Sequence, residues 1–171
     1  MNRPVLLAAL MAGTALLGAC KKEPPASLPP EPEPAVTSTP GDSLGSGVAQ
    51  PGTNEHFVQS VNGQNVIYFD TDGYNIDSVD AAALQTQAQY LNQYGQVNVT
   101  IEGHADERGT REYNLALGER RANAAKNYLV GLGIPSTRIS VVSYGKERPI
   151  ALGSNDQAWA QNRRAVSIVV N

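Results

Sequence analysis

The carboxylate of Asp106 and the guanidinium of Arg121 are the charged groups of this sequence whose spacing best suits a functional site. Asp106 follows residues 97–103, in which apolar and polar residues alternate with the period of a half-buried strand. Arg121 lies in the segment after Thr110, where the period changes to that of a helix. A guanidinium on the apolar face of a helix keeps its charge and needs a polar partner. The sequence therefore predicts that Asp106 and Arg121 flank one crevice, between a strand end and the next helix.

The helix after Thr110 is predicted to bury one apolar stripe, and Arg121 falls inside it. The stripe consists of Leu117, Ala124 and Tyr128, with Ala125 and Leu132 beside them. Two interpretations of the Asp106–Arg121 pair follow. One is an internal salt bridge between strand and helix. The other is a site for a zwitterionic ligand, in which Asp106 binds an ammonium and Arg121 binds a carboxylate in bidentate fashion. Spacing does not distinguish them.

Six short motifs in order give the sequence a recognisable pattern. They are YFDTD at 68–72, GHADERGT at 103–110, EYN at 112–114, LGERRAN at 117–123, VSYGKE at 142–147 and NRRAV at 162–166. Together they resemble the OmpA-like peptidoglycan-binding domain family, and the resemblance extends from about Val66 to the C-terminus. Arg163 and Arg164 match the last motif, and their roles stay open at this point; one of them can simply neutralise acids near the last strand.

The resemblance implies a ligand, a site and partners. The ligand is the peptide stem of peptidoglycan, chiefly meso-diaminopimelate, whose side chain ends in an ammonium and a carboxylate. The implied ligand-binding residues are Asp72, Asp106, Asn114, Leu117 and Arg121. Asp72 can equally cap its loop, and Leu117 can equally belong to the core. The resemblance further implies an outer-membrane lipoprotein of the Tol–Pal envelope system, with TolB as a partner and a role in envelope integrity and cell division.

The N-terminus has the pattern of a bacterial lipoprotein signal. Residues 5–17 are apolar, which is short for the roughly 20 residues that span a bilayer and typical of a signal peptide. The run ends at Leu-Gly-Ala before Cys20, which resembles a lipobox. Residues 1–19 are therefore expected to be removed and Cys20 to be acylated; the alternative is a free thiol after small residues. Lys21 in place of Asp favours the outer membrane by the same resemblance, with the folded domain facing the periplasm.

Residues 20–56 are predicted to be a lipidated cysteine followed by a disordered linker. Eight of the eleven prolines lie there, with almost no large apolar residue, so the segment has too little apolar surface to fold. In extended polyproline II form it would reach on the order of 100 Å. Residues 57–171 are predicted to form the OmpA-like domain.

The order of elements in that domain predicts a two-layer α/β fold. Strands are expected at 65–69, 97–103, 139–144 and 165–170, and helices after Asp77, after Thr110 and at 156–161. In the last strand, Val166, Ile168 and Val170 share a face. The β-α-β-α-β-(α)-β order supports a four-stranded mixed sheet with helices on one face.

The composition argues against three classes of function: nucleic-acid binding, metal binding and catalysis. The net charge of −3, with 17% charged residues, offers no basic groove for nucleic acid. One cysteine and two histidines are too few for a cysteine- or histidine-rich metal site, and no cofactor is expected. His56 is placed in the linker, so His104 is interpreted as a loop histidine with a structural hydrogen bond. An enzyme acting on peptidoglycan would need an activated nucleophile or a metal, so a binding protein is favoured, with a periplasmic scaffold as the alternative.

Overall fold

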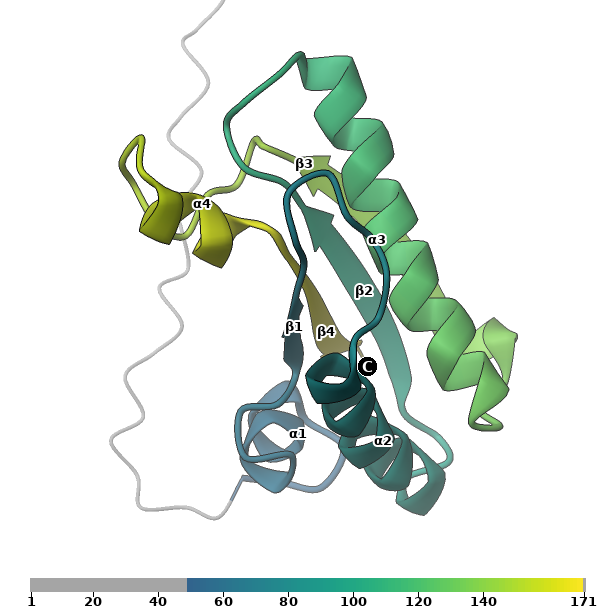
Figure 1. The fold of residues 1–171 in the computed structure, drawn as a ribbon. Coiled ribbons are helices and arrows are strands. Elements are labelled where there is room, and N and C mark those ends of the chain that lie inside the picture. Colours follow the sequence, from purple (N-terminus) through teal and green to yellow (C-terminus); the bar gives the residue numbers. More distant parts are fainter. Residues whose placement is uncertain (1–48, 171) are drawn as a thin grey trace, which may run out of the picture. The chain divides into compact units, whose positions relative to one another are not determined.

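A four-stranded sheet is the frame of residues 49–170, the part of the chain that the computed structural model describes (Figure 1). The strands are β1 (Val66–Tyr68), β2 (Asn98–His104), β3 (Ile139–Gly145) and β4 (Arg164–Val170). The helices are α1 (Asn54–Ser60), α2 (Ser78–Gln93), α3 (Arg111–Gly131) and α4 (Asp156–Asn162), with a 3-10 turn at Ser136–Arg138. Every strand and helix predicted for the domain is present, and α1 is additional. Cys20 and most of the predicted linker lie outside the described residues.

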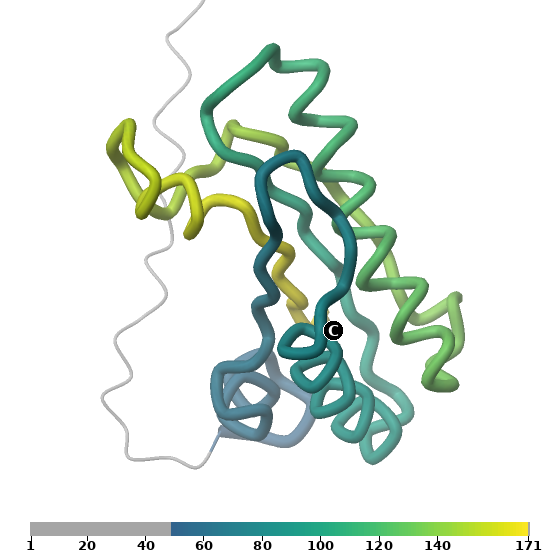
Figure 2. Tube along the Cα trace, viewed as in Figure 1, coloured from purple at the N-terminus to yellow at the C-terminus, as the bar shows by residue number. Residues whose placement is uncertain are grey.

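The sheet is mixed because its last strand is inserted between the first two. The strand order is β1-β4-β2-β3, in which β2 and β3 are parallel and β4 is antiparallel to both of its neighbours. The strands β1, β2 and β3 therefore run in the same direction, and their C-terminal ends meet at one edge, where the chain passes into the β1–α2 and β2–α3 loops (Figure 2). The predicted fold class is confirmed.

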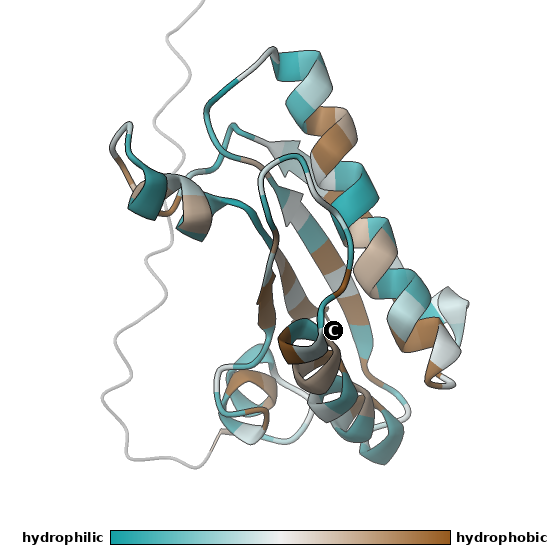
Figure 3. Ribbon diagram, viewed as in Figure 1, coloured by the Kyte–Doolittle hydropathy of each residue, from teal (hydrophilic) through white to brown (hydrophobic). Residues whose placement is uncertain are grey.

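Helices α2 and α3 lie over one face of the sheet, and the apolar core fills the space between them (Figure 3). Val99 and Ile101 of β2 point into this core and are almost fully buried. Val99 is paired with Val169, so Val169 faces the core as well. The prediction that Val166, Ile168 and Val170 share a face is correct. That face points away from the helices and the core, and Val170 is 42% exposed. The core-facing residues of β4 include the small Ala165 and Ser167, which a search for large apolar residues overlooks.

A glycine pair brings α3 unusually close to the sheet. A Cβ atom on Gly103 of β2 would collide with the backbone of Gly118 in α3, and one on Gly118 would collide with Ser143 and with the Gly103 backbone. The buried face of α3 is accordingly set by small residues: Gly118, Ala122 and Ala125 are buried together with Leu117, Arg121 and Leu129. The predicted stripe was therefore wrong in part, since Ala124 and Tyr128 are only half-buried and Leu132 is 37% exposed.

The additional helix α1 anchors the start of the described chain. Thr53 caps it by accepting a hydrogen bond from the His56 amide, and Phe57 is fully buried. The His56 ring lies 2.9 Å from the Tyr90 hydroxyl of α2. The placement of His56 in the linker was therefore wrong. The helix is too short for its periodicity to be recognised in the sequence. In residues 49–170, no helix has the length and apolar character needed to cross a membrane.

The glycine contact predicts opposite results for two alanine substitutions in α3. In an ordinary helix Gly→Ala stabilises by about 1 kcal/mol. Gly118→Ala should instead destabilise the domain by about 1–3 kcal/mol, because the new methyl group collides with backbone atoms. Gly131→Ala is the matched control, since nothing lies within 4 Å of its Cβ position, and it should leave stability unchanged or slightly raised. Urea unfolding of both variants checks this; equal stability of the two would contradict the close approach.

Candidate functional site

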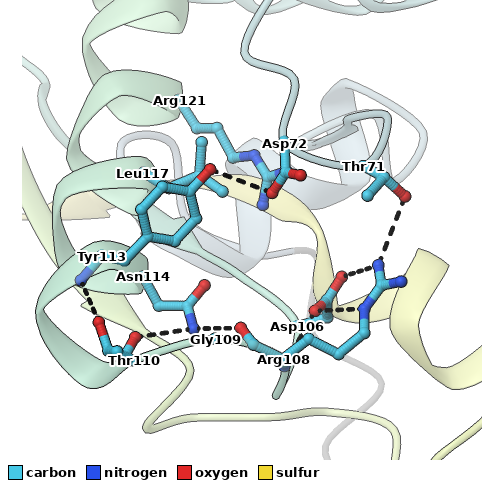
Figure 4. Close-up of a pocket in the computed structure, with 10 residues that line it drawn as sticks. All are labelled: Thr71, Asp72, Asp106, Arg108, Gly109, Thr110, Tyr113, Asn114, Leu117 and Arg121. Carbon is cyan, nitrogen blue, oxygen red and sulfur yellow. Dashed lines mark hydrogen bonds and ion pairs between the residues drawn. The ribbon is translucent and has the colours of Figure 1, made fainter.

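A pocket of about 560 Å³ opens where the β1–α2 loop, the β2–α3 loop and the start of α3 meet (Figure 4). It is lined by Thr71, Asp72, Asp106, Arg108, Gly109, Thr110, Tyr113, Asn114, Leu117 and Arg121. All five residues proposed as ligand contacts from the sequence are among them. The structure thus brings together side chains from two loops and a helix at one edge of the sheet.

Arg121 is the most deeply placed charge of the pocket. Its side chain is fully buried, and its guanidinium donates three hydrogen bonds to backbone carbonyls rather than to a carboxylate. The acceptors are the oxygens of Asp70, Gly73 and His104, at 3.0, 2.8 and 2.8 Å. The guanidinium also lies 5.2 Å from the centre of the Phe69 ring. Arg121 therefore links α3 to the β1–α2 loop and to the C-terminal end of β2.

Burial lowers the pKa of Arg121, but the side chain keeps its positive charge. Removal from water lowers the pKa of Arg121 to about 10, and the nearby charge of Arg163 acts in the same direction, while Asp106 and Asp72 oppose the shift. The group stays cationic at neutral pH. A buried cation with backbone carbonyls as partners favours an anionic group in the pocket.

Asp106 is neutralised by two other arginines. Arg108 donates to both of its carboxylate oxygens, from Nε at 3.0 Å and from Nη2 at 2.7 Å, and also through its backbone amide. Arg163 Nη1 lies 3.5 Å from Oδ2. Burial alone would raise the pKa of Asp106, but the hydrogen bonds from Arg108 and Arg163 outweigh it and hold that pKa below its usual value.

The internal salt bridge between Asp106 and Arg121 was therefore a wrong interpretation. Among the described residues, the ion pairs of Asp106 are formed with Arg108 and Arg163. Arg121 is instead satisfied by main-chain oxygens, as described above. The two residues do flank one crevice, as predicted, and both line the pocket. The open role of Arg163 is settled in part: it neutralises Asp106, and its Nε also donates to the Phe69 carbonyl at 2.9 Å.

Asp72 and Asn114 occupy opposite sides of the pocket. Asp72 has a φ of 55°, a left-handed conformation that Asp adopts more readily than most residues, and it accepts a hydrogen bond of 3.1 Å from the Tyr113 hydroxyl. Asn114 donates from Nδ2 to the carbonyls of Arg108 and Thr110, at 2.6 and 3.1 Å. Asn114 thus holds the β2–α3 loop in shape as well as lining the pocket.

The N-terminus of α3 adds a site for negative charge. Thr110 is its N-cap, and its hydroxyl accepts a hydrogen bond from the Tyr113 amide. Gly109 has a φ of 83°, which turns the chain into the helix at a position where a side chain would be strained. The unpaired amides of a first helical turn attract anions. Thr110, Tyr113 and Asn114, at this end of the helix, line the same pocket as Arg121 (Figure 4).

His104 differs from its sequence interpretation. It ends β2 rather than lying in a loop, it is 1% exposed, and neither ring nitrogen has a hydrogen-bond partner within the described part of the chain. Its ring is stacked on Tyr144. Burial, with the charges of Arg164 and Arg148, lowers the pKa of His104 to about 4, so its 3.5 Å contact with Glu102 is not an ion pair at neutral pH. Residues 49–170 contain no group of three side chains that could hold a metal ion.

Sequence reasoning missed the residues that surround Asp106. Arg108 was available from the sequence, because an arginine two residues after an aspartate on a loop can fold back on it. Trp159 could not be predicted from the sequence, because only the tertiary fold brings α4 to the loop. There the guanidinium carbon of Arg108 lies 4.3 Å from the centroid of the Trp159 ring. Tyr113, the partner of Asp72, likewise requires the loop and the helix to be placed first.

Known proteins resemble this chain over most of its length. Residues 68–163 match the OmpA family. The peptidoglycan-associated lipoprotein of Rhizobium meliloti is 46% identical over 168 residues, which are 98% of this chain and 88% of that protein. The protein of the same name from Haemophilus influenzae is 42% identical over 132 residues, 77% of this chain and 86% of its own.

Solved structures agree with these relatives. The crystal structure of the peptidoglycan-associated lipoprotein from Burkholderia pseudomallei has a TM-score of 0.63 at 43% identity, and the match covers 67% of this chain and 99% of that one. The C-terminal domain of Helicobacter pylori MotB has a TM-score of 0.58 at 18% identity, covering 62% of this chain and 84% of that one. This second likeness is one of fold alone.

The carbonyl contacts of Arg121 predict a large loss of stability when the residue is changed. Arg121→Ala removes three charge-assisted hydrogen bonds from carbonyls in and around the pocket and should destabilise the domain by at least about 3 kcal/mol. Arg121→Lys keeps the charge but loses the planar fork, so it should recover only part of that loss. Arg120→Ala, at an exposed neighbour, is the control and should change stability by less than about 0.5 kcal/mol. Urea unfolding that shows similar stability for all three variants would refute the structural role.

The pKa of His104 predicts a loss of stability in acid. The folded protein holds His104 neutral down to about pH 4, whereas the unfolded chain takes up a proton below about 6.5. The stabilising contribution is therefore complete above pH 6.5 and falls as the pH decreases toward 4. Between pH 7 and pH 4.5 the wild type should lose about 2 kcal/mol more than His104→Phe, which keeps a ring against Tyr144 and cannot titrate. Equal losses in the two proteins would show that His104 is not buried in its neutral form.

Proposed function

Because the chain belongs to the OmpA family, and within it to the relatives called peptidoglycan-associated lipoproteins, we propose that it binds peptidoglycan non-covalently through the pocket at Arg121. The ligand is the peptide stem, chiefly the side-chain end of meso-diaminopimelate. The single observation that carries this proposal is the gathering of Arg121, Asp106 and Asp72 around one pocket at a helix N-terminus. These charges are complementary to a ligand end that bears both a carboxylate and an ammonium.

Arg121 supplies the carboxylate half of the site. A guanidinium has five N–H donors, and the three bonds to carbonyls use Nε and one hydrogen on each terminal nitrogen. One donor on each terminal nitrogen is left, which is the pair that binds a carboxylate in bidentate fashion. The N-terminus of α3 lies beside the same pocket, and its helix dipole adds to the attraction for negative charge.

Asp106 and Asp72 supply the ammonium half. Both carboxylates line the pocket. Arg108 donates to both oxygens of Asp106, and the Tyr113 hydroxyl donates to Oδ1 of Asp72. Leu117 packs its apolar side chain at the pocket wall, where the methylene groups of a diaminopimelate side chain would lie. Asn114 has its Nδ2 committed to the loop, so its Oδ1 is the atom it offers to a ligand N–H.

The proposed cellular role is mechanical. Cys20 carries the lipid anchor in the outer membrane, the segment between Cys20 and α1 forms the tether, and the domain that begins with α1 binds the wall from the periplasm. The protein would act within the Tol–Pal system, with TolB as a partner, in envelope integrity and cell division. Its work is binding without catalysis. The names of the relatives support the lipoprotein and peptidoglycan parts of this role; the anchor, tether and Tol–Pal parts rest on the sequence resemblance.

A second candidate function is a periplasmic scaffold in which the pocket residues are purely structural. It is favoured by the contacts of Arg121 with carbonyls and by the neutralisation of Asp106 by arginines, since both arrangements are complete without a ligand. The two functions differ in one respect only, which is whether the domain binds the wall. Incubation with purified sacculi also tests the third possibility, because an enzyme would release soluble muropeptides.

Sedimentation with purified sacculi tests the proposed function. Wild-type domain should cosediment, and Asp106→Asn, which removes the charge but keeps the shape, should bind at least about tenfold more weakly. Glu119→Gln, an exposed charge change on α3, is the control and should bind as wild type. Sacculi whose diaminopimelate carboxylate is amidated should bind wild type weakly, because the partner of Arg121 has lost its charge. Unchanged binding by Asp106→Asn and to amidated sacculi would place the ligand elsewhere, and absence of wild-type binding would favour the scaffold.

A further inference from the structure

Arg108 occupies the position in which a ligand ammonium would meet Asp106. Its guanidinium donates to both carboxylate oxygens, at 3.0 and 2.7 Å, and so forms the fork that Asp106 would otherwise offer to an incoming cation. In Figure 4 the Arg108 side chain lies along the pocket with its guanidinium between Asp106 and Thr71. Thr71 Oγ1 accepts a further, longer hydrogen bond of 3.4 Å from Nη2.

The outer face of the Arg108 guanidinium is covered by an aromatic ring. Trp159 of α4 stacks on it, with the guanidinium carbon 4.3 Å from the ring centroid. The indole is held in place because its Nε1 donates to Glu107 Oε1 at 3.0 Å. Arg108 is thus packed between a fixed tryptophan and Asp106, in one defined position.

The two partners of this ion pair differ in their access to water. The Arg108 side chain is 41% exposed, whereas that of Asp106 is 9% exposed. Arg108 can therefore turn into solvent and remain hydrated, but Asp106 cannot, and it needs a replacement cation when Arg108 leaves. Arg163, at 3.5 Å, is the partner that stays. A ligand ammonium that enters the pocket must exchange places with Arg108.

Such an exchange yields less binding free energy than contact with an unpaired carboxylate would, because one cation replaces another on the same carboxylate. A ligand that offers only an ammonium gains one charge-assisted contact and breaks an existing one. A ligand that also offers a carboxylate gains the contact with Arg121, for which the protein has no internal competitor among the described carboxylates. The ammonium half of the site is therefore weak alone and effective only in combination.

We propose that Arg108 is an internal competitor for Asp106, so that a ligand ammonium must displace it and binding depends on the carboxylate that accompanies that ammonium. This inference rests on the proposed function. Its chemical consequence concerns two classes of stem. Diaminopimelate has both groups, while lysine at the same stem position has the ammonium alone. Arg108 would thus weaken the ammonium contact of both stems, and diaminopimelate alone would keep a further contact, at Arg121.

Calorimetric titration of the intact domain with two synthetic stem tripeptides tests this role. They share L-Ala-γ-D-Glu and end in either meso-diaminopimelate or L-lysine. Wild type should bind the diaminopimelate stem, and Arg108→Gln should bind both stems about tenfold more tightly than wild type does, because either ammonium then meets the vacated Asp106 without a competitor. Arg111→Gln, an exposed arginine at the start of α3 with an ion pair outside the pocket, is the control and should keep the wild-type affinities.

Trp159 provides an independent readout, since it is the single tryptophan of the chain. When the diaminopimelate stem binds wild type, Arg108 should leave the indole and the emission of Trp159 should change. In Arg108→Gln the emission should stay constant on binding. This signal reports the movement of Arg108 itself, whatever the affinities are.

The possible failures are distinguishable. If wild type binds neither tripeptide nor sacculi, the proposed function is wrong, and the competitor role falls with it. If wild type binds the diaminopimelate stem but Arg108→Gln binds both stems with wild-type affinity or more weakly, Arg108 is a bystander or a direct contact and only the competitor role is overturned. Binding by wild type without a change in Trp159 emission would overturn it as well.

Discussion

A buried guanidinium that is bonded to main-chain oxygens is the interaction on which this domain depends. Arg121 reaches from α3 to the carbonyls of Asp70, Gly73 and His104, and so joins a helix to the ends of two strands. Removing its charge from water is tolerable only because these carbonyls are fixed in position to receive it. These three contacts restrain the β1–α2 loop and the C-terminal end of β2, from which the β2–α3 loop starts. The pocket is thus a consequence of how one cation is satisfied, and the same cation then faces the ligand.

Two further features make that placement possible. The close approach of Gly103 and Gly118 lets α3 lie close to the sheet, where Arg121 is within hydrogen-bond distance of the His104 carbonyl at the end of β2. The second feature is electrostatic: Asp106 is paired with Arg108 and with Arg163, which lies between α4 and β4, so that the cations and carboxylates near the pocket offset one another before a ligand arrives. A ligand must therefore displace an internal partner before it can use Asp106.

The sequence predicts much of this fold, because alternating and helical periods in residues 97–132 are long, and the two long helices begin where they were expected, after Asp77 and after Thr110. It also predicts that Arg121 is buried beside a crevice. It does not predict the partners of Arg121, because backbone carbonyls exist at every residue and carry no pattern. It does not identify the core face of β4, because the small Ala165 and Ser167 give that face a weak apolar signal. The stacking of Trp159 on Arg108 depends on α4 being folded against the loop, and no local signal records it.

The central claim is that Arg121 holds the pocket together and binds the ligand carboxylate with the donors that remain. A crystal structure of the domain with the diaminopimelate tripeptide tests this most directly. The account predicts that a ligand carboxylate lies within about 3 Å of both terminal nitrogens of Arg121, while the contacts with Asp70, Gly73 and His104 are kept. A complex in which the tripeptide lies elsewhere, or in which Arg121 breaks its carbonyl contacts to reach the ligand, would contradict it.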